Sequence, residues 1–581
     1  MELQANARTL TNILSVNKKY IVPRFQREYS WGKEQINELW FDIISNIKWK
    51  QEDDSFELNE YFLGALVLVG QETSSSLLIV DGQQRLTTLT ILLSALCDLF
   101  KDNNEEAVAA SIYNNYIAGI DDDGKSFFKL INESPKPFFQ NNIQHIVKRN
   151  EDAVSTEEKS LKAALDELKH NLSAENLMSS LSIPNNRFNY IDTLKAVRDE
   201  VLRFLKVIYI TVNDEDEAYT IFETLNARGL NLSYVDLIKN KLFKKLSDTH
   251  PDDDAKTKWN NIRKILSSRS GVGTMETFIR HWWVSKYSYV SSDNVYKAFI
   301  EKWRKEEIDA SGFIDELLHD APIYVMISSP VETDFPELEM KAVFRGLQAL
   351  KLFNIVQNKP FLLSLFKARA QGKLKLVDLK RAILSTERFH FLFNAICSLR
   401  PSGIENAYSK TARFLISNES NKKTNRQAID SLLNILFKRK PDQLTFKDKF
   451  EKLKFSNKEL KNKRLIQYIF NRIELYGFPY GEYVPDSLTL EHVMSQSGAD
   501  PELIGMIGNL IPLPKELNEE ADNKPVPQKI PIYEKSRYRM VEDFIRDYKK
   551  MYKSNWDENA IMVRTSFLAN HAYLDVWKLG D

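Results

Sequence analysis

The chain has 581 residues, enough for three or four domains, and its 43% apolar content is sufficient to build real cores. Its 80 Lys and Arg residues balance 80 Asp and Glu residues, so the net charge does not indicate a binding partner. Only the distribution of charge along the chain can indicate one. With only Cys97 and Cys397, a disulfide scaffold and a zinc ribbon are excluded. The first residues lack the pattern of a signal peptide, and no uncharged apolar run reaches the roughly 20 residues of a membrane helix. We therefore expect a cytoplasmic protein that does not enter a membrane.

The N-terminal stretch combines amide, guanidinium and aromatic side chains. A helix predicted over Asn12–Tyr20 leads into an extended segment, because the Val22-Pro23 step disfavours helix. That segment then presents four side chains of interest: Gln26, Arg27, Tyr29 and Trp31. In one interpretation the aromatic residues anchor a core and Arg27 is a surface charge. In the other, the segment contacts a base or a nucleotide across a cleft.

Two strands are predicted next, after a helix over Glu34–Lys48 and an acidic loop over Gln51–Glu60. The run Tyr61–Gly70 reads as the first strand, and residues 71–76 as a turn into a second strand over Leu77–Val80. These elements predict a small mixed sheet surrounded by helices.

The motif Asp81-Gly82-Gln83-Gln84-Arg85 falls where the second strand meets a helix, since apolar residues recur at helical spacing from Leu86. Unpaired N–H groups at a helix start can bind an anion, Gly82 permits close approach of a phosphate, and Arg85 offers a planar fork. Asp81 could hold a metal ion or orient a water. The alternative is that Asp81 caps the helix and Gly82 makes the turn. We favour the functional interpretation, because four adjacent polar residues exceed what a cap requires.

A further polar group follows the helical, charged region that we expect over residues 100 to 200. A strand is predicted over Arg203–Val212, and then a helix that ends near Asn226–Gly229. A glycine cap explains Gly229, but it does not explain Asn226, Arg228 and Lys239 together. These three side chains could add donors to the same phosphate site.

The middle of the chain, about 250 to 420, carries long helical periodicity and no catalytic cluster. The balance of charge then shifts, because residues 421–472 contain 15 Lys or Arg against 5 Asp or Glu. This stretch predicts a track for a phosphate backbone through Lys438, Arg439 and Lys440. The alternative is a lysine-rich face that only contacts solvent.

A second chemical site is predicted near the C-terminus, where Leu488–Met494 reads as a short strand that carries Glu491 and His492. Sixteen residues separate His492 from Asn509, and eight separate Asn509 from Asn518. This order of strand, loop and helix is that of an HNH (ββα-metal) nuclease. A histidine can accept the proton of an attacking water, and carboxylate and amide oxygens suit Mg²⁺ or Mn²⁺.

In this interpretation each residue has its own role. His492 is the base, Asn509 positions the loop, and Glu491 and Asn518 are metal ligands. Two lysines that follow, Lys524 and Lys529, are expected to contact phosphate.

Together the two sites resemble the GmrSD-type, modification-dependent (type IV) restriction endonucleases of bacteria. The N-terminal resemblance rests on Gln26-Arg27 with Tyr29 and Trp31, on the motif at 81–85, and on Asn226 with Arg228-Gly229. The C-terminal resemblance rests on Glu491-His492, Gly508-Asn509-Leu510 and Asn518. One departure is Ser495, which stands after Met494 where family members usually have proline.

The resemblance implies a ParB/sulfiredoxin-like N-terminal fold that binds and hydrolyses GTP or ATP. We expect the nucleotide to contact Gln26, Arg27, Gly82–Arg85, Asn226 and Arg228, with Lys239 as an added donor, and we expect Asp81 and Arg85 to act catalytically. It also implies an HNH end that nicks or cuts double-stranded DNA, typically phage DNA with modified bases or a phosphorothioate backbone, as in SspE-like proteins.

We therefore predict a mostly helical α+β protein with three parts: an NTP-binding domain (1–245), a helical linker or docking domain (246–420) and a nuclease domain (421–581). The predicted function is an NTP-regulated, Mg²⁺-dependent DNA endonuclease of anti-phage defence. The alternative is a nucleotide-controlled DNA-binding regulator whose HNH-like end does not cut. The sequence leaves the oligomeric state open, a homodimer included.

Overall fold

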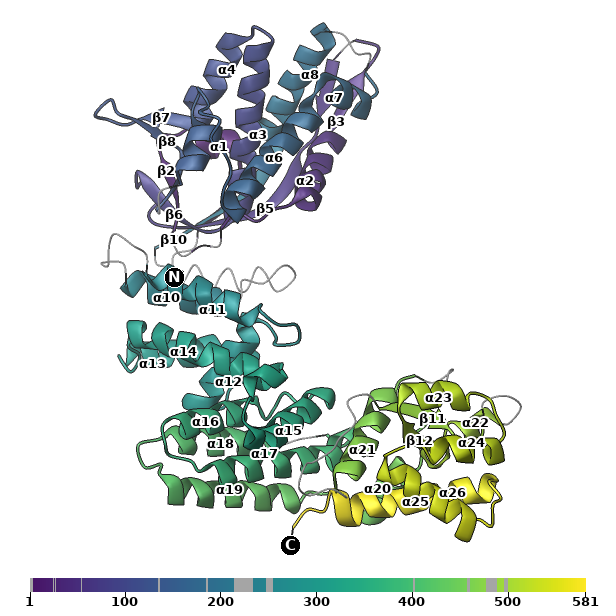
Figure 1. Ribbon diagram of the computed structural model, residues 1–581. Coiled ribbons are helices and arrows are strands. Elements are labelled where there is room, and N and C mark those ends of the chain that lie inside the picture. Colours follow the sequence, from purple (N-terminus) through teal and green to yellow (C-terminus); the bar gives the residue numbers. More distant parts are fainter. Residues whose placement is uncertain are drawn as a thin grey trace. The chain divides into compact units, whose positions relative to one another are not determined.

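The chain divides into two compact units, Met1–Lys244 and Lys245–Asp581 (Figure 1). The computed structural model describes residues 4–23, 26, 28–53, 55–133, 136–183, 187–213, 234–246, 254–400, 403–456, 460–476, 488–495 and 500–580. Both units are rich in helix, and the first contains a six-stranded sheet. The predicted mostly helical α+β class is thereby confirmed. The predicted boundary at residue 420 stays a prediction.

The sheet of the first unit is mixed. Its strands lie in the order β1 (Gln4–Thr9), β10 (Leu205–Val212), β5 (Tyr61–Val69), β6 (Ser76–Asp81), β2 (Lys19–Val22) and β9 (Leu130–Asn132). Strands β5 and β6 form the predicted antiparallel hairpin, and β10 lies parallel to β5 on its other side. The start of β6 pairs with β2 over Ser76–Leu78, whereas its end at Asp81 pairs with Val67 of β5.

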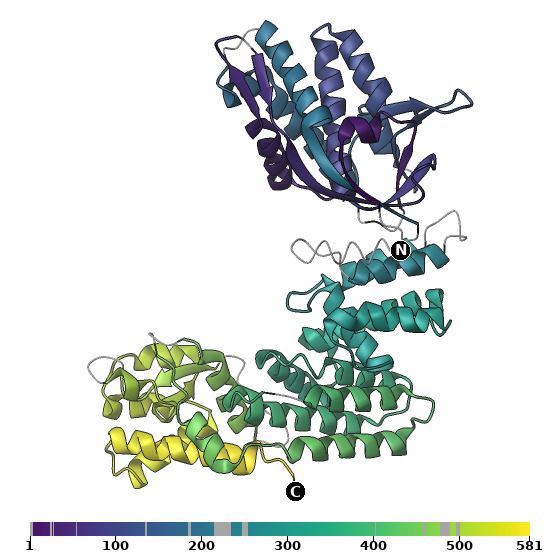
Figure 2. The same cartoon turned by 180° about the vertical axis from the view of Figure 1, so that it is seen from behind.

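Helices pack against this sheet around α3 (Gln83–Asp102), which rises beside α4 (Glu106–Ile112), α6 (Thr156–Leu172) and α8 (Arg187–Asp199) (Figures 1 and 2). Most of α3 is buried, including apolar residues on every side, such as Leu89, Ile91, Leu92, Leu93 and Leu96. A helix that is apolar all round belongs in a core. The remaining helices of this unit are α1 (Leu10–Leu14), α2 (Lys33–Ser45), α5 (Pro137–Phe139), α7 (Ala174–Ser180) and, at the boundary, α10 (Tyr234–Lys245).

Two local predictions in this unit were wrong. Residues 12–20 were expected as one helix, but α1 ends at Leu14 and Lys19–Val22 forms β2. Strand β2 pairs with both β6 and β9, so backbone hydrogen bonds from distant segments override the local preference. Part of the expected loop 51–60 is β4 (Ser55–Leu58), which pairs with β3 (Ile47–Lys50). Another hairpin joins β7 (Ala118–Ile120) to β8 (Ser126–Phe128).

The second unit begins with helices, as the periodicity predicts. They are α11 (Asp254–Leu266), α12 (Met275–Lys286), α13 (Val295–Arg304), α14 (Ala310–Ser328), α15 (Lys341–Leu352), α16 (Lys359–Ala370), α17 (Leu376–His390), α18 (Ile404–Ile416) and α19 (Lys422–Phe437). The paired residues Trp282 and Trp283 are fully buried core residues of α12. Among the described residues, no helix combines the length and the apolar character needed to cross a bilayer.

The same unit ends in a smaller group of elements around a two-stranded hairpin (Figure 1). The hairpin is β11 (Thr489–His492) with β12 (Leu510–Leu513), and around it lie α20 (Gln443–Phe450), α21 (Lys463–Tyr476), α22 (Pro501–Ile504), α23 (Lys515–Ala521), α24 (Val526–Tyr533), α25 (Arg539–Lys550) and α26 (Glu558–His571). Buried Glu387 of α17 accepts hydrogen bonds from Tyr468 of α21 and from Trp577 near the C-terminus. These bonds tie the middle helices to the C-terminal group.

Candidate functional site

The motif at 81–85 lies at a strand-to-helix junction, as predicted. Asp81 is the last residue of β6, and Gly82 precedes α3 with φ of +94°. This left-handed conformation favours glycine, and a Cβ at residue 82 would also lie 2.8 Å from the Leu66 side chain. Glycine is thus required here by the turn itself, whatever binds nearby.

The side chains of this motif have partners within the first unit. Arg85 donates from Nη1 to the carbonyl of Ala65 at 2.5 Å, and its Nη2 lies 3.7 Å from Asp81 Oδ2. Gln84, 6% exposed, accepts from the backbone N–H of Ser30 at 3.0 Å and donates to the carbonyl of Glu28 at 3.2 Å. The polar motif therefore holds its surroundings in place, in addition to any role toward a ligand.

The segment that contains Gln26, Tyr29 and Trp31 meets this junction. Gln26 donates to the carbonyl of Val80 at 3.0 Å, and the hydroxyl of Tyr29 lies 2.8 Å from that of Thr88 on α3. Tyr29 is 3% exposed and packs in the core, which is what the anchor interpretation predicts for it. The structure also brings amide and guanidinium groups together at the end of β6, which the ligand interpretation needs.

Three predicted nucleotide residues lie outside the described residues: Arg27, Asn226 and Arg228. The predicted cap residue Gly229 lies outside them as well. Lys239 is described on α10, where it is buried and its ammonium group lies 5.3 Å from the ring centre of Phe243.

The second predicted site forms around β11 and β12, which pair antiparallel with His492 opposite Leu510 and Glu491 opposite Ile511. Successive side chains of a strand point to opposite faces. Glu491 and His492 accordingly have different surroundings: the Glu491 carboxylate contacts α24, and the His492 ring contacts Phe455. The predicted base and the predicted metal ligand Glu491 therefore lie on different faces of β11.

His492 is 7% exposed, and its Nε2 lies 2.9 Å from the carbonyl oxygen of Phe455. A carbonyl only accepts, so in the neutral ring Nε2 carries the proton and Nδ1 the lone pair. The phenyl ring of Phe455 also stacks on the imidazole of His492, with ring centres 5.5 Å apart. Burial lowers the pKa of His492, so the ring is neutral near pH 7. Sequence reasoning missed Phe455, because a backbone carbonyl leaves no signal in residue type.

Asn509 makes the contacts that its predicted positioning role needs. It is fully buried, and its Oδ1 accepts from the N–H of Met494 at 2.8 Å and from Trp556 Nε1 at 3.0 Å. Its Nδ2 donates to the carbonyls of Met494 and Ile504 at 3.0 and 2.9 Å. The chain that leaves His492 is thereby fixed to the residue before β12.

The preceding Gly508 packs directly on α26, because a Cβ there would lie 2.2 Å from Thr565 Oγ1 and 2.3 Å from the carbonyl of Ile561. Buried Arg564 donates to the carbonyls of Gly508 and Leu510 at 2.6 and 2.7 Å. Trp556 and Ile561 belong to the buried core that also contains Val493 and Ile511 of the hairpin region.

Both predicted metal ligands have hydrogen-bond partners within the protein. Glu491 Oε1 already accepts from Lys529 Nζ at 2.6 Å and from the hydroxyl of Tyr533 at 2.9 Å. Asn518 donates to Thr489 Oγ1 at 2.8 Å. In the described part of the chain, no three His, Cys, Asp or Glu side chains group in a way that could hold a metal ion.

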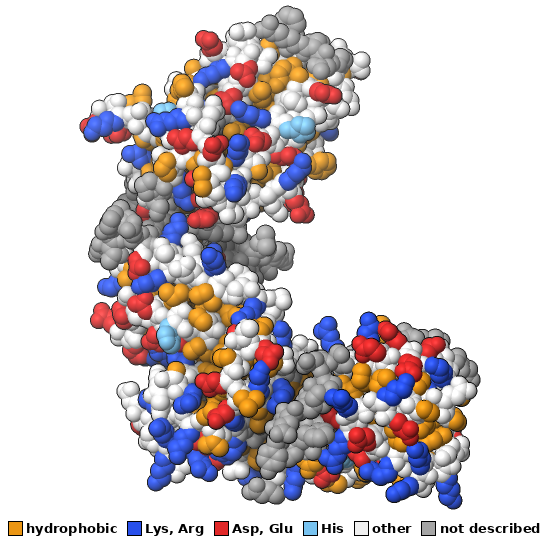
Figure 3. Space-filling view, in the orientation of Figure 1, with side chains coloured by type: hydrophobic (Ala, Val, Ile, Leu, Met, Phe, Trp, Pro, Cys, Tyr) orange, Lys and Arg blue, Asp and Glu red, His pale blue; other side chains and the backbone are white. Residues whose placement is uncertain are grey.

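The predicted DNA-contacting residues fall into two kinds. Lys438, Arg439, Lys440 and Lys524 are exposed, whereas Lys529 is fully buried and bonded within the protein. Figure 3 shows Lys and Arg side chains over the second unit, interspersed with Asp and Glu.

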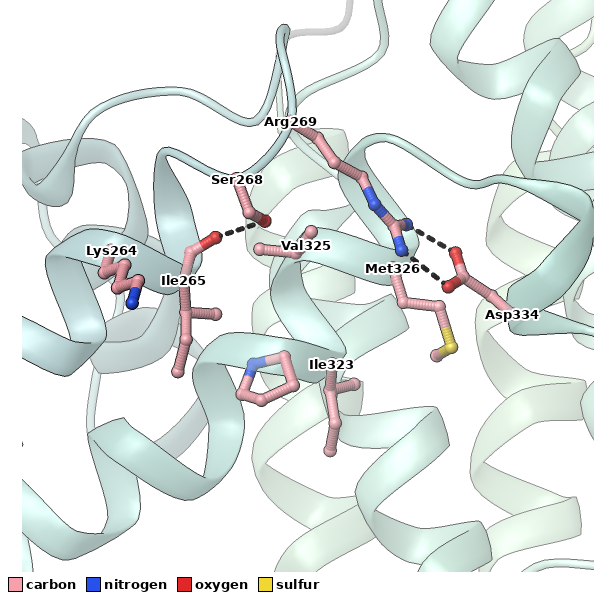
Figure 4. Close-up of a pocket in the computed structure, with 9 residues that line it drawn as sticks. Lys264, Ile265, Ser268, Arg269, Ile323, Val325, Met326 and Asp334 are labelled. Atoms are coloured by element: carbon pink, nitrogen blue, oxygen red, sulfur yellow. Dashed lines mark hydrogen bonds and ion pairs between the residues drawn. The ribbon is translucent and has the colours of Figure 1, made fainter.

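A pocket of about 570 Å³ lies elsewhere in the second unit, between α11 and α14 (Figure 4). Its rim carries the ion pair of Arg269 with Asp334, in which both guanidinium nitrogens contact the carboxylate at 2.5 and 2.8 Å. None of the predicted site residues lines it.

Comparison with known protein families finds a match at each end of the chain. The profile of the GmrSD restriction endonuclease N-terminal domain matches residues 10–243, and that of the C-terminal domain matches residues 440–571. The chain belongs to the GmrSD restriction endonucleases. As a member of this family it is a DNA endonuclease of phage defence. No curated protein matches the chain.

The two GmrSD matches enclose the two predicted sites. The junction of β6 and α3 lies in the N-terminal match, and the hairpin with His492 and Asn509 lies in the C-terminal match. The helical stretch from α11 to α19 lies in neither match.

Proposed function

We propose that this GmrSD endonuclease hydrolyses a phosphodiester bond of DNA with His492 as the group that accepts the proton of the attacking water, in a site of the HNH type. The observation that carries the proposal is the fixed, neutral imidazole. Its Nε2 is bonded to the Phe455 carbonyl, its pKa is lowered by burial, and Asn509 holds the chain that follows it. A neutral, oriented histidine can act as a general base near pH 7.

The proposal includes a requirement for Mg²⁺ or Mn²⁺. It does not assign Glu491 as a ligand, because the carboxylate of Glu491 is bonded to Lys529. It also includes double-stranded DNA as substrate, modified on its bases or carrying phosphorothioate, as the resemblance implies.

The proposal further places GTP or ATP at the junction of β6 and α3, where it controls cutting. The support is the grouping of Asp81, Gly82 and Arg85 at a helix start, with Gln26 bonded to the end of β6 beside them. Helix starts and guanidinium forks are suited to phosphate oxygens.

A plasmid nicking assay tests the nuclease proposal. The full chain is incubated with Mg²⁺, with Mn²⁺ and with EDTA, on modified and unmodified plasmid. We expect cutting with either metal ion and none in EDTA. His492→Ala should abolish cutting, whereas the matched change at the exposed His170 should leave the rate unchanged. A His492→Ala protein that cuts at the wild-type rate would refute the assignment of the base.

Nucleotide binding is tested separately, by equilibrium binding of a fluorescent GTP or ATP analogue. Arg85→Ala should weaken binding at least tenfold, and Arg149→Ala, at an exposed position, should not. Equal affinities in the two variants would contradict the proposed nucleotide site. DNA binding without cutting under every condition would instead support the regulator that holds DNA.

A further inference from the structure

A buried ion pair lies directly beside the proposed base. Lys529 is fully buried and Glu491 is 4% exposed, and the Lys529 ammonium lies 2.6 Å from Glu491 Oε1. The same ammonium donates to the main-chain carbonyl of His492 at 2.7 Å. Lys529 therefore contacts both residues of the Glu-His pair, one through its side chain and one through its backbone.

A third group completes this cluster. The hydroxyl of Tyr533 donates to Glu491 Oε1 at 2.9 Å. Lys529 and Tyr533 are four residues apart on α24, so their side chains lie on one face of the helix. The face of α24 that meets β11 thus carries one cation and one phenol, and both are directed at a single carboxylate oxygen.

The charges in this cluster compensate each other. Burial by itself raises the pKa of Glu491, and the Lys529 ammonium opposes this shift. The negative charge of the buried Glu491 carboxylate is therefore balanced by the Lys529 ammonium, and the Tyr533 hydroxyl donates to the same oxygen. A divalent cation on the same oxygen would lie beside Lys529 and be repelled by it.

The cluster and the imidazole lie on opposite faces of β11, and the main chain of His492 joins them. The Phe455 carbonyl fixes the ring from one side, and Lys529 fixes the backbone from the other. Asn509 fixes the next residues. Three sets of contacts from three segments therefore determine where the imidazole points.

We propose that Glu491, Lys529 and Tyr533 form an anchor that positions His492, and that Glu491 is the partner of Lys529 and not a metal ligand. Lys529 is in this view a positioning residue of the nuclease site. The inference rests on the proposed function in which His492 acts on water.

The test compares four variants of the full chain: Glu491→Gln, Lys529→Met, the double variant Glu491→Gln/Lys529→Met, and Tyr533→Phe. Each single charge removal leaves one buried charge without its partner, whereas the double variant removes both charges at similar volume. The control is Lys535→Met, which breaks the exposed pair with Glu520 just beyond the end of α24.

Three measurements are made on every variant: kcat and KM for plasmid nicking, the affinity for Mn²⁺ alone by electron paramagnetic resonance, and hydrogen exchange of a peptide that covers β11. We expect each single charge variant to lower kcat at least tenfold with KM for DNA unchanged, and to change Mn²⁺ affinity less than threefold. The double variant should recover kcat to within fivefold of wild type. Tyr533→Phe should lower kcat about two- to fivefold, and Lys535→Met should change nothing.

A metal-ligand role for Glu491 gives the opposite pattern. Glu491→Gln would then weaken Mn²⁺ binding tenfold or more, and the double variant would stay as inactive as the single one; this result would overturn the proposal. If a single variant does not fold but the double variant folds and cuts, the anchor is supported. Hydrogen exchange distinguishes failure of the anchor from failure of the proposed function. A wild-type enzyme that never cuts DNA refutes the proposed function. The anchor is still supported in that case if exchange in β11 is faster in Lys529→Met and returns to the wild-type rate in the double variant.

Discussion

Replacing Asn509 by alanine should open the β11–β12 hairpin locally. The side chain makes four buried hydrogen bonds, two through Oδ1 and two through Nδ2. A typical buried hydrogen bond contributes about 1 kcal/mol, so the loss of all four should cost about 4 kcal/mol of local stability. At about 1.4 kcal/mol per factor of ten, hydrogen exchange in β11 should become roughly a thousand times faster, up to the rate set by global unfolding.

Hydrogen exchange followed by mass spectrometry on peptides that cover residues 488–495 and 507–513 measures this effect directly. Trp556→Phe removes only one of the four bonds, so it should accelerate exchange about fivefold. Asn523→Ala, at an exposed position, is the matched control and should have no effect. Exchange in Asn509→Ala that rises less than tenfold would refute the reasoning, because the network would then not hold the hairpin.

Three further outcomes are expected. Gly508→Ala should destabilise the second unit by about 1 to 3 kcal/mol through the clash with Thr565, as measured by thermal unfolding, whereas Gly32→Ala, with only the Gln35 side chain near, should be tolerated. Glu200 is buried, neither of its oxygens has a hydrogen-bond partner among the described residues, and burial raises its pKa to about 7. The folded state thus binds the proton more tightly than the unfolded state, so stability is lost as pH rises from 4.5 to 7, by up to about 1.4 kcal/mol per pH unit. In denaturant titrations, the difference in unfolding free energy between wild type and Glu200→Gln should change with pH by this slope. A difference that stays constant with pH would contradict the prediction. Replacing Lys438, Arg439 and Lys440 by alanine should lower the slope of log affinity against log salt by about 3 for DNA binding, and an unchanged slope would show that these residues do not contact the backbone.

The role of Lys529 shows where residue type misleads. A lysine that follows a candidate nuclease motif predicts a phosphate contact, and its exposed neighbour Lys524 is still available for one. Lys529 instead lies at 0% exposure, with its ammonium on Glu491. The two lysines are five residues apart, but Lys524 precedes α24, whereas Lys529 lies on α24 with its ammonium directed at Glu491 of β11.

Residues 12–20 show the same limit for the fold. The local pattern predicts helix through Tyr20, but Lys19–Val22 becomes an inner strand between β6 and β9. The partner segments come from residues 76–78 and 130–132, so the pairing is decided by chain segments far away in sequence. Periodicity within a short window contains no information about them.

The sequence by itself determined the elements whose signals are local: the strand and turn before α3, the hairpin of β5 and β6, the long helices of the second unit, and the order of Glu491, His492, Asn509 and Asn518 that points to the family. Only the tertiary structure decided which way these side chains point. Glu491 and His492 are adjacent in sequence, yet the alternation of a strand directs one to Lys529 and the other to Phe455, and both partners come from segments at least 37 residues away. Spacing along the chain fixes which residues are present, but packing of distant segments fixes which atoms meet.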